Sequence, residues 1–492
     1  MPRLALMLLP AGLIVAVGTA ADPVPPAGKI SYFKDVRPIF QQHCQGCHQP
    51  AKPGGSYVMT EFAGLLKPGE SGNPGVVPGN LTDSHLLALV TVKDGKAEMP
   101  RDREPLKPVQ VETITRWIRE GAADDTPASA KGALIDAEHP PVYRAPPVIT
   151  SVAYSPDGKL LAVTGYHEIL LHDAASPGSP ARLIGMSERV QSIAFSPDGK
   201  FLAAAAGDPG RFGEVQVWDV AKRELKLSVP VTFDTVYGVS WSPDGTAVAF
   251  GCADNTVRAV DAFTGKQVLQ MGTHSDWVLD TAFSRDGQHL ASVGRDMSMK
   301  LTEVATQRFV DNVTSITPGA LKGGLMAVDI RPKTPGRWLQ VRPNDTPNAP
   351  RKLYDEMLVA GSDGMPRLYK MHREDKQRVI GDDANRVKEY ESMPGRVSGV
   401  AFDRDGRRFA AASSLDGKGE VRVYDVSSGQ KVVLEMVTGP AYAVAWHPQG
   451  TVIASAGFDG RVWLHDPATG KLVKEFIAVP YAPDRIPLVR AD

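Results

Sequence analysis

Two of the three cysteines of this chain stand three positions apart in "HCQGCHQP", residues 43–50, and a histidine follows the second one directly. Cys44, Cys47 and His48 therefore form a C-x-x-C-H pattern. Two thiols on one side of a helical turn can each bond a vinyl group of haem, while the adjacent imidazole ligates the iron. The spacing thus indicates covalent attachment of one haem c.

Three other chemistries also use closely spaced cysteines. A structural zinc ion needs further ligands, but the third cysteine, Cys252, lies about two hundred residues away in a different pattern. A thioredoxin-like redox pair needs a strand-helix-strand unit, which the surrounding sequence does not have. A disulfide across only two intervening residues is sterically awkward. The pattern therefore favours haem over zinc, a redox pair and a plain disulfide.

A haem iron with one histidine ligand either takes a second axial ligand or keeps an open position. Met99, in "AEMPRDREP", stands in a polar loop where packing gives a methionine little purpose, and Pro100 stiffens the turn after it. A thioether ligand raises the reduction potential and favours electron transfer. Met59, His43 and His85 compete with Met99 for this role, although His43 is expected to lie too close to the attachment turn to reach the far face.

A helix is predicted to lead into the cysteine pattern. In "SYFKDVRPIFQQHCQGCH", residues 31–48, Val36, Ile39 and Phe40 recur at helical spacing with the two cysteines. One face of this helix can therefore pack on the haem edge.

A second amphipathic helix is predicted in "KPVQVETITRWIREGA", residues 107–122. Pro108 suits its first turn, Gly121 is placed to end it, and Trp117 belongs to its apolar stripe and is expected in the core. A short apolar helix is expected near residues 86–90, between these two. The three helices predict a small all-α domain over residues 21–124.

The first twenty residues have the layout of a secretory signal. One arginine precedes an apolar stretch over residues 4–17, which Pro10 interrupts and which is short for a membrane span, and small residues follow. We expect cleavage after Ala20 or Ala21. The mature protein is therefore expected to be exported, periplasmic or extracellular, without membrane insertion.

The overall composition excludes several function classes. Hydrophobic residues are 42% and charged residues 23% of the 492 residues, as in a folded globular protein rather than a disordered or collagen-like one. The 55 basic residues nearly balance the 56 acidic ones, and no run of like charges suggests nucleic acid or an anionic membrane. Partners are expected to be proteins recognised by shape.

Several ordered motifs over residues 36–122 resemble the planctomycete-type cytochrome c domain. They are "CQGCH", "GESGNPGVVPGNLTDSHLLALV", "EMP" and "RWIREGA". The resemblance implies haem c bound covalently by Cys44 and Cys47, with His48 as the proximal ligand. Met99 matches the methionine of the family's Met-Pro element, which implies that it is the second axial ligand.

A Pro- and Ala-rich stretch over residues 125–147 reads as a linker, and an internal repeat follows it. Each unit has a strand that ends in a tight turn of the type "SPDG". The spacings of successive turns are 41, 46, 42, 47, 72 and 44 residues, which is the period of a propeller blade. The turns start at Ser155, Ser196, Ser242, Ser284, Arg331, Asp403 and His447. The repeat predicts an all-β, seven-bladed propeller over residues 148–480, followed by a tail over residues 481–492.

These units resemble the WD-repeat family. Trp218 and Asp219 supply the name-giving pair once, and only Thr273-His274 approximates the family's Gly-His pair. Asp173, Asp425 and Asp466 end the equivalent strand in other units. The widest spacing holds a polar insertion over residues 337–356, expected to be a long loop.

The propeller sequence contains no nucleophile elbow, phosphate loop or paired carboxylates, and Cys252 is expected to be a buried small hydrophobe. The spacing of its histidines does not predict a shared metal site. These histidines are His167, His172, His274, His289, His372, His447 and His465. The favoured function is therefore a non-enzymatic electron carrier whose propeller docks a redox partner protein. Two alternatives are a haem-containing sensing or interaction scaffold and a propeller oxidoreductase with haem c as an electron relay.

Overall fold

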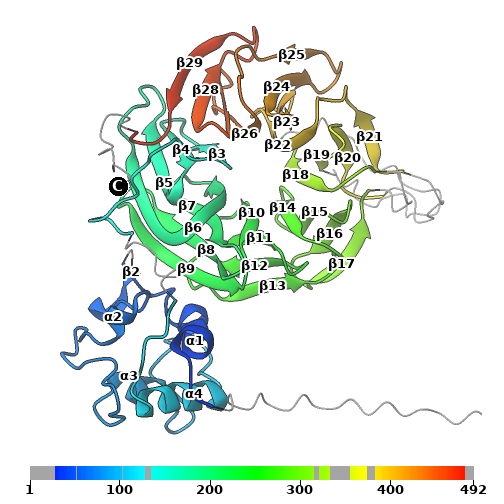
Figure 1. Ribbon diagram of the computed structural model, residues 1–492. Helices are drawn as coiled ribbons and strands as arrows, with labels where there is room; N and C mark the ends of the chain where they lie inside the picture. The colour runs from blue at the N-terminus through cyan, green and yellow to red at the C-terminus, as the bar shows by residue number, and fades with distance from the viewer. Residues whose placement is uncertain are drawn as a thin grey trace, which may run out of the picture.

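The computed structural model describes residues 28–50, 52–101, 103–127, 135–314, 321–332, 355–373 and 383–481. The leader expected at residues 1–20 and most of the insertion and C-terminal tail lie outside these residues. The chain forms a helical region, residues 28–127, beside a ring of β-sheets over residues 152–477 (Figure 1). No helix in the described part is long and apolar enough to cross a membrane.

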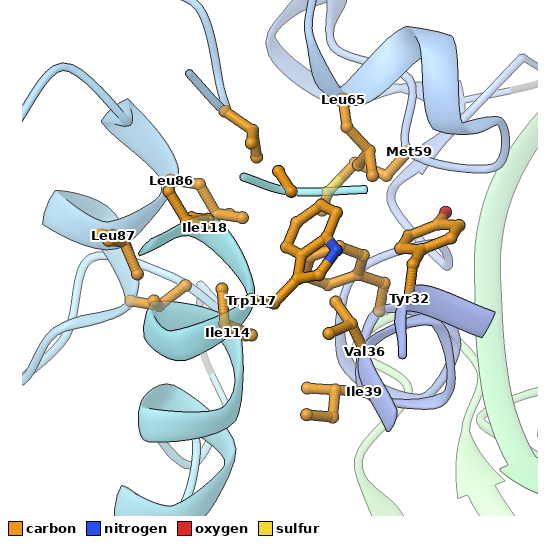
Figure 2. Close-up of a cluster of buried hydrophobic side chains, with 14 of the residues drawn as sticks. Tyr32, Val36, Ile39, Met59, Leu65, Leu86, Leu87, Ile114, Trp117 and Ile118 are labelled. Atoms are coloured by element: carbon orange, nitrogen blue, oxygen red, sulfur yellow. The ribbon is translucent and has the colours of Figure 1, made fainter. Parts of the chain in front are cut away.

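The helical region is built from short elements around one apolar core. Trp117 is 1% exposed, as expected for a core residue, and its ring stacks on Tyr32 with the centroids 5.4 Å apart (Figure 2). The second predicted helix and the short one before it are both present. The elements are η1 (a π-helix, Tyr32–Val36), α1 (Arg37–His43), β1 (His48–Gln49), β2 (Lys52–Pro53), η2 (a 3-10 helix, Gly54–Ser56), α2 (Phe62–Leu65), α3 (His85–Val90) and α4 (Pro108–Arg119).

The helix that leads into the cysteine pattern is shorter than predicted. It ends at His43, because Cys44 has φ −121° and leaves the helical conformation. The amides of Cys47 and His48 both donate to the carbonyl of Cys44 at 3.1 Å, which closes a tight turn. The prediction that both cysteines continue the helical stripe is therefore wrong: the side chain of Cys44 packs on the core, whereas Cys47 is exposed.

The β-strands form seven four-stranded blades around a central axis, in agreement with the seven predicted repeat units (Figure 1). Five blades are separate sheets. The first two share one seven-stranded sheet, because the long strand β6 is the outer strand of the first blade and then the inner strand of the second. The fourth strand of each blade carries no motif that the sequence analysis singled out.

The first three blades comprise β3 (Val152–Tyr154), β4 (Leu160–Thr164), β5 (Tyr166–Asp173), β6 (Ala181–Phe195), β7 (Phe201–Asp208), β8 (Phe212–Asp219), β9 (Glu224–Thr232), β10 (Val236–Trp241), β11 (Ala247–Cys252), β12 (Val257–Asp261) and β13 (Gln267–Met271). The next two comprise β14 (Val278–Phe283), β15 (His289–Gly294), β16 (Met299–Glu303), β17 (Arg308–Asn312), β18 (Leu325–Ile330), β19 (Glu356–Gly361), β20 (Arg367–Lys370) and β21 (Arg386–Glu389). The last two comprise β22 (Arg396–Phe402), β23 (Arg408–Leu415), β24 (Lys418–Asp425), β25 (Lys431–Val433), β26 (Ala441–Trp446), β27 (Ile453–Gly457), β28 (Arg461–His465) and β29 (Leu472–Ile477).

The "SPDG" turns connect the first two strands of a blade through one repeated hydrogen-bond pattern. Ser155 Oγ donates to Asp157 Oδ1 at 2.7 Å and accepts from the amide of Leu160 at 2.9 Å. Gly158 has φ +75°, in the left-handed region that glycine adopts without steric cost. The same hydroxyl contacts recur at Ser196, Ser242 and Ser284.

Neighbouring blades are joined by polar side chains in, or directly before, their inner strands, a feature that the repeat pattern did not reveal. Each of these side chains accepts a hydrogen bond from a backbone amide of the following blade. The donor and acceptor pairs are Ile193 to Ser151 at 3.3 Å, Val239 to Ser192 at 3.1 Å, Val328 to Asp280 at 2.9 Å and Phe402 to Asp329 at 2.7 Å. The amide of Ile149 closes the ring by donating to the carbonyl of Gly457 at 2.8 Å.

Candidate functional site

A cavity in the helical region brings together three of the four residues that the sequence analysis selected. Cys44, His48 and Met99 all line it, although they come from the turn after α1, from β1 and from the loop after α3. Its volume is about 790 Å³ with the open mouth included. Cys47 is not among the lining residues.

His48 has the tautomer and orientation of a metal ligand. Its Nδ1 lies 3.1 Å from the carbonyl oxygen of Tyr57. A carbonyl can only accept, so Nδ1 carries the proton and Nε2 keeps its lone pair. The ring of Tyr57 meets the imidazole edge-on, with the centroids 5.9 Å apart. An imidazole that is oriented through one nitrogen and free at the other is the usual arrangement of a ligating histidine.

The two cysteines differ in environment. Burial raises the pKa of the Cys44 thiol to about 12, and the nearby Cys47 adds to this effect. Cys44 therefore stays a neutral thiol at ordinary pH. A thioredoxin-like pair has one thiol with a lowered pKa, so this environment does not suit such a pair. Both thiols are free in the structure.

Two buried glutamines hold the turn of residues 44–48, and the sequence analysis missed both. Gln45, 2% exposed, donates from Nε2 to the carbonyl of Met59 at 2.9 Å. Gln49, fully buried, donates from Nε2 to the carbonyl of Gln45 at 3.2 Å. No sequence signal distinguishes these amides from surface glutamines, because their burial depends on the packing of residues 45–59.

Met99 is half-buried against the core of the helical region. Its backbone amide donates to the carbonyl of Leu89 at 2.9 Å, which ties the loop to the end of α3. Met59 also lines the cavity, but it is 1% exposed and belongs to the core, so packing accounts for it.

The two competing histidines line the cavity as well. The Nε2 atom of His43 lies 3.1 Å from the side-chain nitrogen of Gln110, an amide that can only donate. The lone pair of His43 at Nε2 is therefore occupied. Burial lowers the pKa of His43, and Arg103 and Lys107 add to the shift. His85 is the first residue of α3, and its backbone amide donates to the carbonyl of Pro74 at 3.2 Å.

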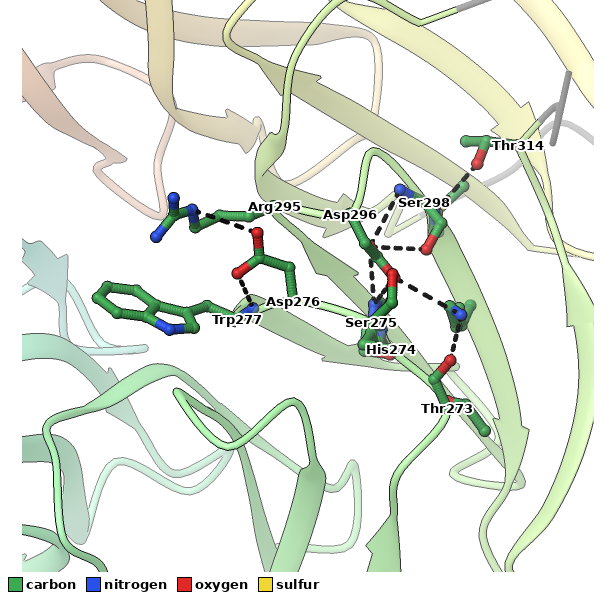
Figure 3. A network of polar contacts seen from close by, with 12 residues as sticks. Thr273, His274, Ser275, Asp276, Trp277, Arg295, Asp296, Ser298 and Thr314 are labelled. Atoms are coloured by element: carbon green, nitrogen blue, oxygen red, sulfur yellow. Dashed lines mark hydrogen bonds and ion pairs between the residues drawn. The ribbon is translucent and has the colours of Figure 1, made fainter. Parts of the chain in front are cut away.

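In the propeller, Cys252 is fully buried, as predicted. No group of three or more His, Cys, Asp or Glu side chains in the described part of the chain comes together to hold a metal ion. His274 instead forms a structural network in the fourth blade (Figure 3): Nδ1 lies 3.0 Å from both carboxylate oxygens of Asp296, and Nε2 lies 2.8 Å from Ser292 Oγ. This is the blade in which Thr273-His274 approximates a Gly-His pair.

Comparison with protein families finds two kinds of match in this order along the chain. Residues 44–102 match planctomycete cytochrome C. Residues 179–210, 265–302 and 433–466 match the WD domain, G-beta repeat, and residues 210–281 match the WD40 domain of anaphase-promoting complex subunit 4.

Curated relatives resemble parts of the chain. Actin-interacting protein 1 of Drosophila melanogaster is 25% identical over 48% of this chain and 34% of its own length. WD repeat and SOCS box-containing protein 1 of Danio rerio is 32% identical over 19% of this chain and 22% of its own length. Serine-threonine kinase receptor-associated protein of Gallus gallus is 22% identical over 48% of this chain and 68% of its own length.

The chain thus spans about a third or less of the first two relatives. The family matches confirm the resemblance drawn from the motifs: this chain carries a planctomycete cytochrome C segment followed by a WD-repeat propeller scaffold.

Proposed function

We propose that this protein is an exported c-type cytochrome that transfers single electrons, with one haem c attached to Cys44 and Cys47 and a propeller that docks protein partners, among them a redox partner. The observation that carries the proposal is one cavity lined by Cys44, Met99 and His48, whose Nδ1 is held by the Tyr57 carbonyl so that Nε2 keeps its lone pair. The planctomycete cytochrome C match over residues 44–102 supports the same assignment.

The residues of the cavity fit a haem c. His48 offers Nε2 while Tyr57 holds Nδ1, and Met99 offers a thioether from a loop that Leu89 anchors. When bound, haem c supplies a one-electron couple at its iron. A sulfur ligand from Met99 favours a high reduction potential.

The similarity of the propeller to WD-repeat proteins supports the proposed docking role. WD-repeat proteins of other functions match its repeats, and in the described residues it offers no clustered metal ligands. Export rests on the leader expected at residues 1–20, which lies outside the described residues.

The test is the absorption spectrum, oxidised and reduced, of full-length protein exported from a host with haem c maturation, together with a pyridine haemochrome count. We expect one covalent haem per chain and the weak long-wavelength band of a sulfur-iron bond. Met99→Ala should abolish this band, whereas Met59→Leu, a change of similar volume in the core, should keep it.

Absence of covalent haem in the wild-type protein would refute the proposal. A normal covalent haem without the sulfur band would exclude Met99 as a ligand and favour the sensing alternative, since an open iron position suits binding of small gases.

A further inference from the structure

The helical region meets the propeller along β9, the outer strand of the second blade (Figure 1). This strand ends the seven-stranded sheet, so the backbone groups on one side of it have no partner within the sheet. Both α1 and β2 lie against it. The elements that flank the cysteine pattern therefore rest on an open sheet edge.

The first contact is made by Gly46, between the two cysteines. A Cβ atom at this position would lie 2.5 Å from the carbonyl oxygen of Ser228 and 3.1 Å from Cδ of Pro230. The distance of 2.5 Å is shorter than real Cβ atoms show, and the atom in the way belongs to the backbone of β9, which cannot move aside as the end of a flexible side chain could. The attachment turn is therefore packed against β9 so closely that only glycine fits.

The second contact is made by Lys52, on the strand that pairs with His48. The hairpin of β1 and β2 sets His48 opposite Pro53 and Gln49 opposite Lys52. Lys52 Nζ donates to the carbonyl of Lys226 on β9 at 2.7 Å. The carbonyls of Lys226 and Ser228 both face the helical region, since Lys52 contacts the first and Gly46 lies against the second. The hairpin that carries His48 and the turn that carries the cysteines thus rest on carbonyls of the same strand.

The strand β9 is itself fixed from within the blade. Ser228 Oγ donates to the carboxylate of Glu214, which is fully buried on β8. Ser187 Oγ and Gln216 Nε2 donate to the same carboxylate at 2.5 and 2.7 Å. Three donors around one buried carboxylate hold Ser228, and with it the carbonyl that meets Gly46, in one place.

A third contact between the helical region and the propeller lies near the loop that carries Met99. Arg103, four residues after Met99, places Nη2 3.3 Å from the position of a Cβ at Gly265, in the turn before β13. The third blade therefore also reaches the helical region, next to the loop that offers the thioether.

We propose that β9 is a positioning element of the haem site: the propeller edge holds the attachment turn at Gly46 and the His48 hairpin at Lys52, and so sets the geometry of the haem ligands. The proposal rests on the haem attachment proposed above. Gly46 and Lys52 act through the turn and the hairpin, not by touching haem iron. The propeller then completes the haem-binding unit in addition to docking partners.

The main test uses full-length Lys52→Met, which keeps the aliphatic stem and removes the donor. Loss of this hydrogen bond should speed hydrogen exchange of the amides of residues 47–59 by about three- to tenfold. The same variant, with haem attached, should show a shifted reduction potential and a weakened sulfur-iron band. Lys93→Met, at an exposed lysine of the same region, should change none of these quantities.

Gly46→Val gives a second, independent disturbance, since its side chain must push the turn away from Ser228. It should produce the same changes at residues 47–59 with a larger amplitude. The proposal is overturned if Lys52→Met and Gly46→Val both leave the exchange rates, the potential and the band equal to those of Lys93→Met. A wild-type protein without covalent haem would refute the proposed function, and the exchange of residues 47–59 would then still show whether β9 holds the turn and the hairpin in place.

Discussion

The helical region and the propeller secure their structures in different ways. The helical region has short helices around one core, and that core also borders the cavity. The propeller repeats one turn and one type of inter-blade hydrogen bond, and its apolar clusters are formed between successive blades. Removing a core side chain from the helical region should therefore destabilise the whole region. Removing a side chain from the propeller should destabilise only its own blade and the neighbouring blades.

Trp117→Ala should be the strongest way to expose this difference. The indole packs on Tyr32, Phe40 and Phe62, and its Nε1 donates to the carbonyl of Ala123 at 3.1 Å. Its removal should cost about 3–5 kcal/mol, enough to unfold a small domain. Urea unfolding followed by absorbance of the proposed haem for the helical region and by far-ultraviolet circular dichroism for the propeller measures the two parts separately.

The absorbance of the proposed haem should be lost at much lower urea in Trp117→Ala, while the β-sheet transition stays near that of the wild-type protein. Phe233→Ala, at a side chain that is 68% exposed in the propeller, should move neither transition by more than about 0.5 kcal/mol. A single shared transition in Trp117→Ala would show that the two regions unfold as one unit.

The difference between the two regions also explains which features could be predicted from the sequence. Cys44, Cys47 and His48 were visible because their chemistry lies in three nearby residues, and the blades were visible because their turn recurs. The glutamines of the turn at residues 44–48 and the contact of Gly46 with β9 were not visible, since both depend on how other segments of the chain pack on this turn.

The course of individual strands was also hidden. The continuous strand β6 serves two blades, although the period of the turns treats each blade as a separate unit. The helical stripe through Cys47 failed because periodicity does not indicate where the turn after His43 begins.

His274→Ala should have a smaller effect, confined to the fourth blade. It removes the hydrogen bonds to Asp296 and Ser292 and leaves a carboxylate that is 4% exposed without its main partner. The expected cost is about 1–3 kcal/mol of unfolding free energy for the propeller transition. A cost equal to that of Trp117→Ala would contradict the idea that propeller stability is distributed.

The pH dependence of the same pair gives a second readout. Burial alone would raise the pKa of Asp296. Hydrogen bonds from His274, Ser298 and the Ser275 amide, together with the charge of His274, outweigh the effect of burial and hold the pKa at about 2. A depressed carboxyl pKa contributes stability that is present above about pH 4 and is lost as the pH falls towards 2. His274→Ala should therefore lose less stability than the wild-type protein between pH 4 and 2, measured by urea unfolding at each pH.

Ser196→Ala should have the smallest effect, because it removes one of several equivalent turns. The hydroxyl of Ser196 bridges Asp198, at 2.7 Å, and the amide of Phe201, at 3.0 Å, so its loss should cost about 1 kcal/mol. The sixth blade shows how the turn can be restored: Asp403 accepts from the amide of Arg408 at 3.1 Å, at the equivalent spacing of five residues. Ser196→Asp should therefore retain more stability than Ser196→Ala in thermal unfolding of the propeller. If the aspartate costs more than the alanine, the blades are not interchangeable at this turn, and the repeat must be treated as seven individual structures.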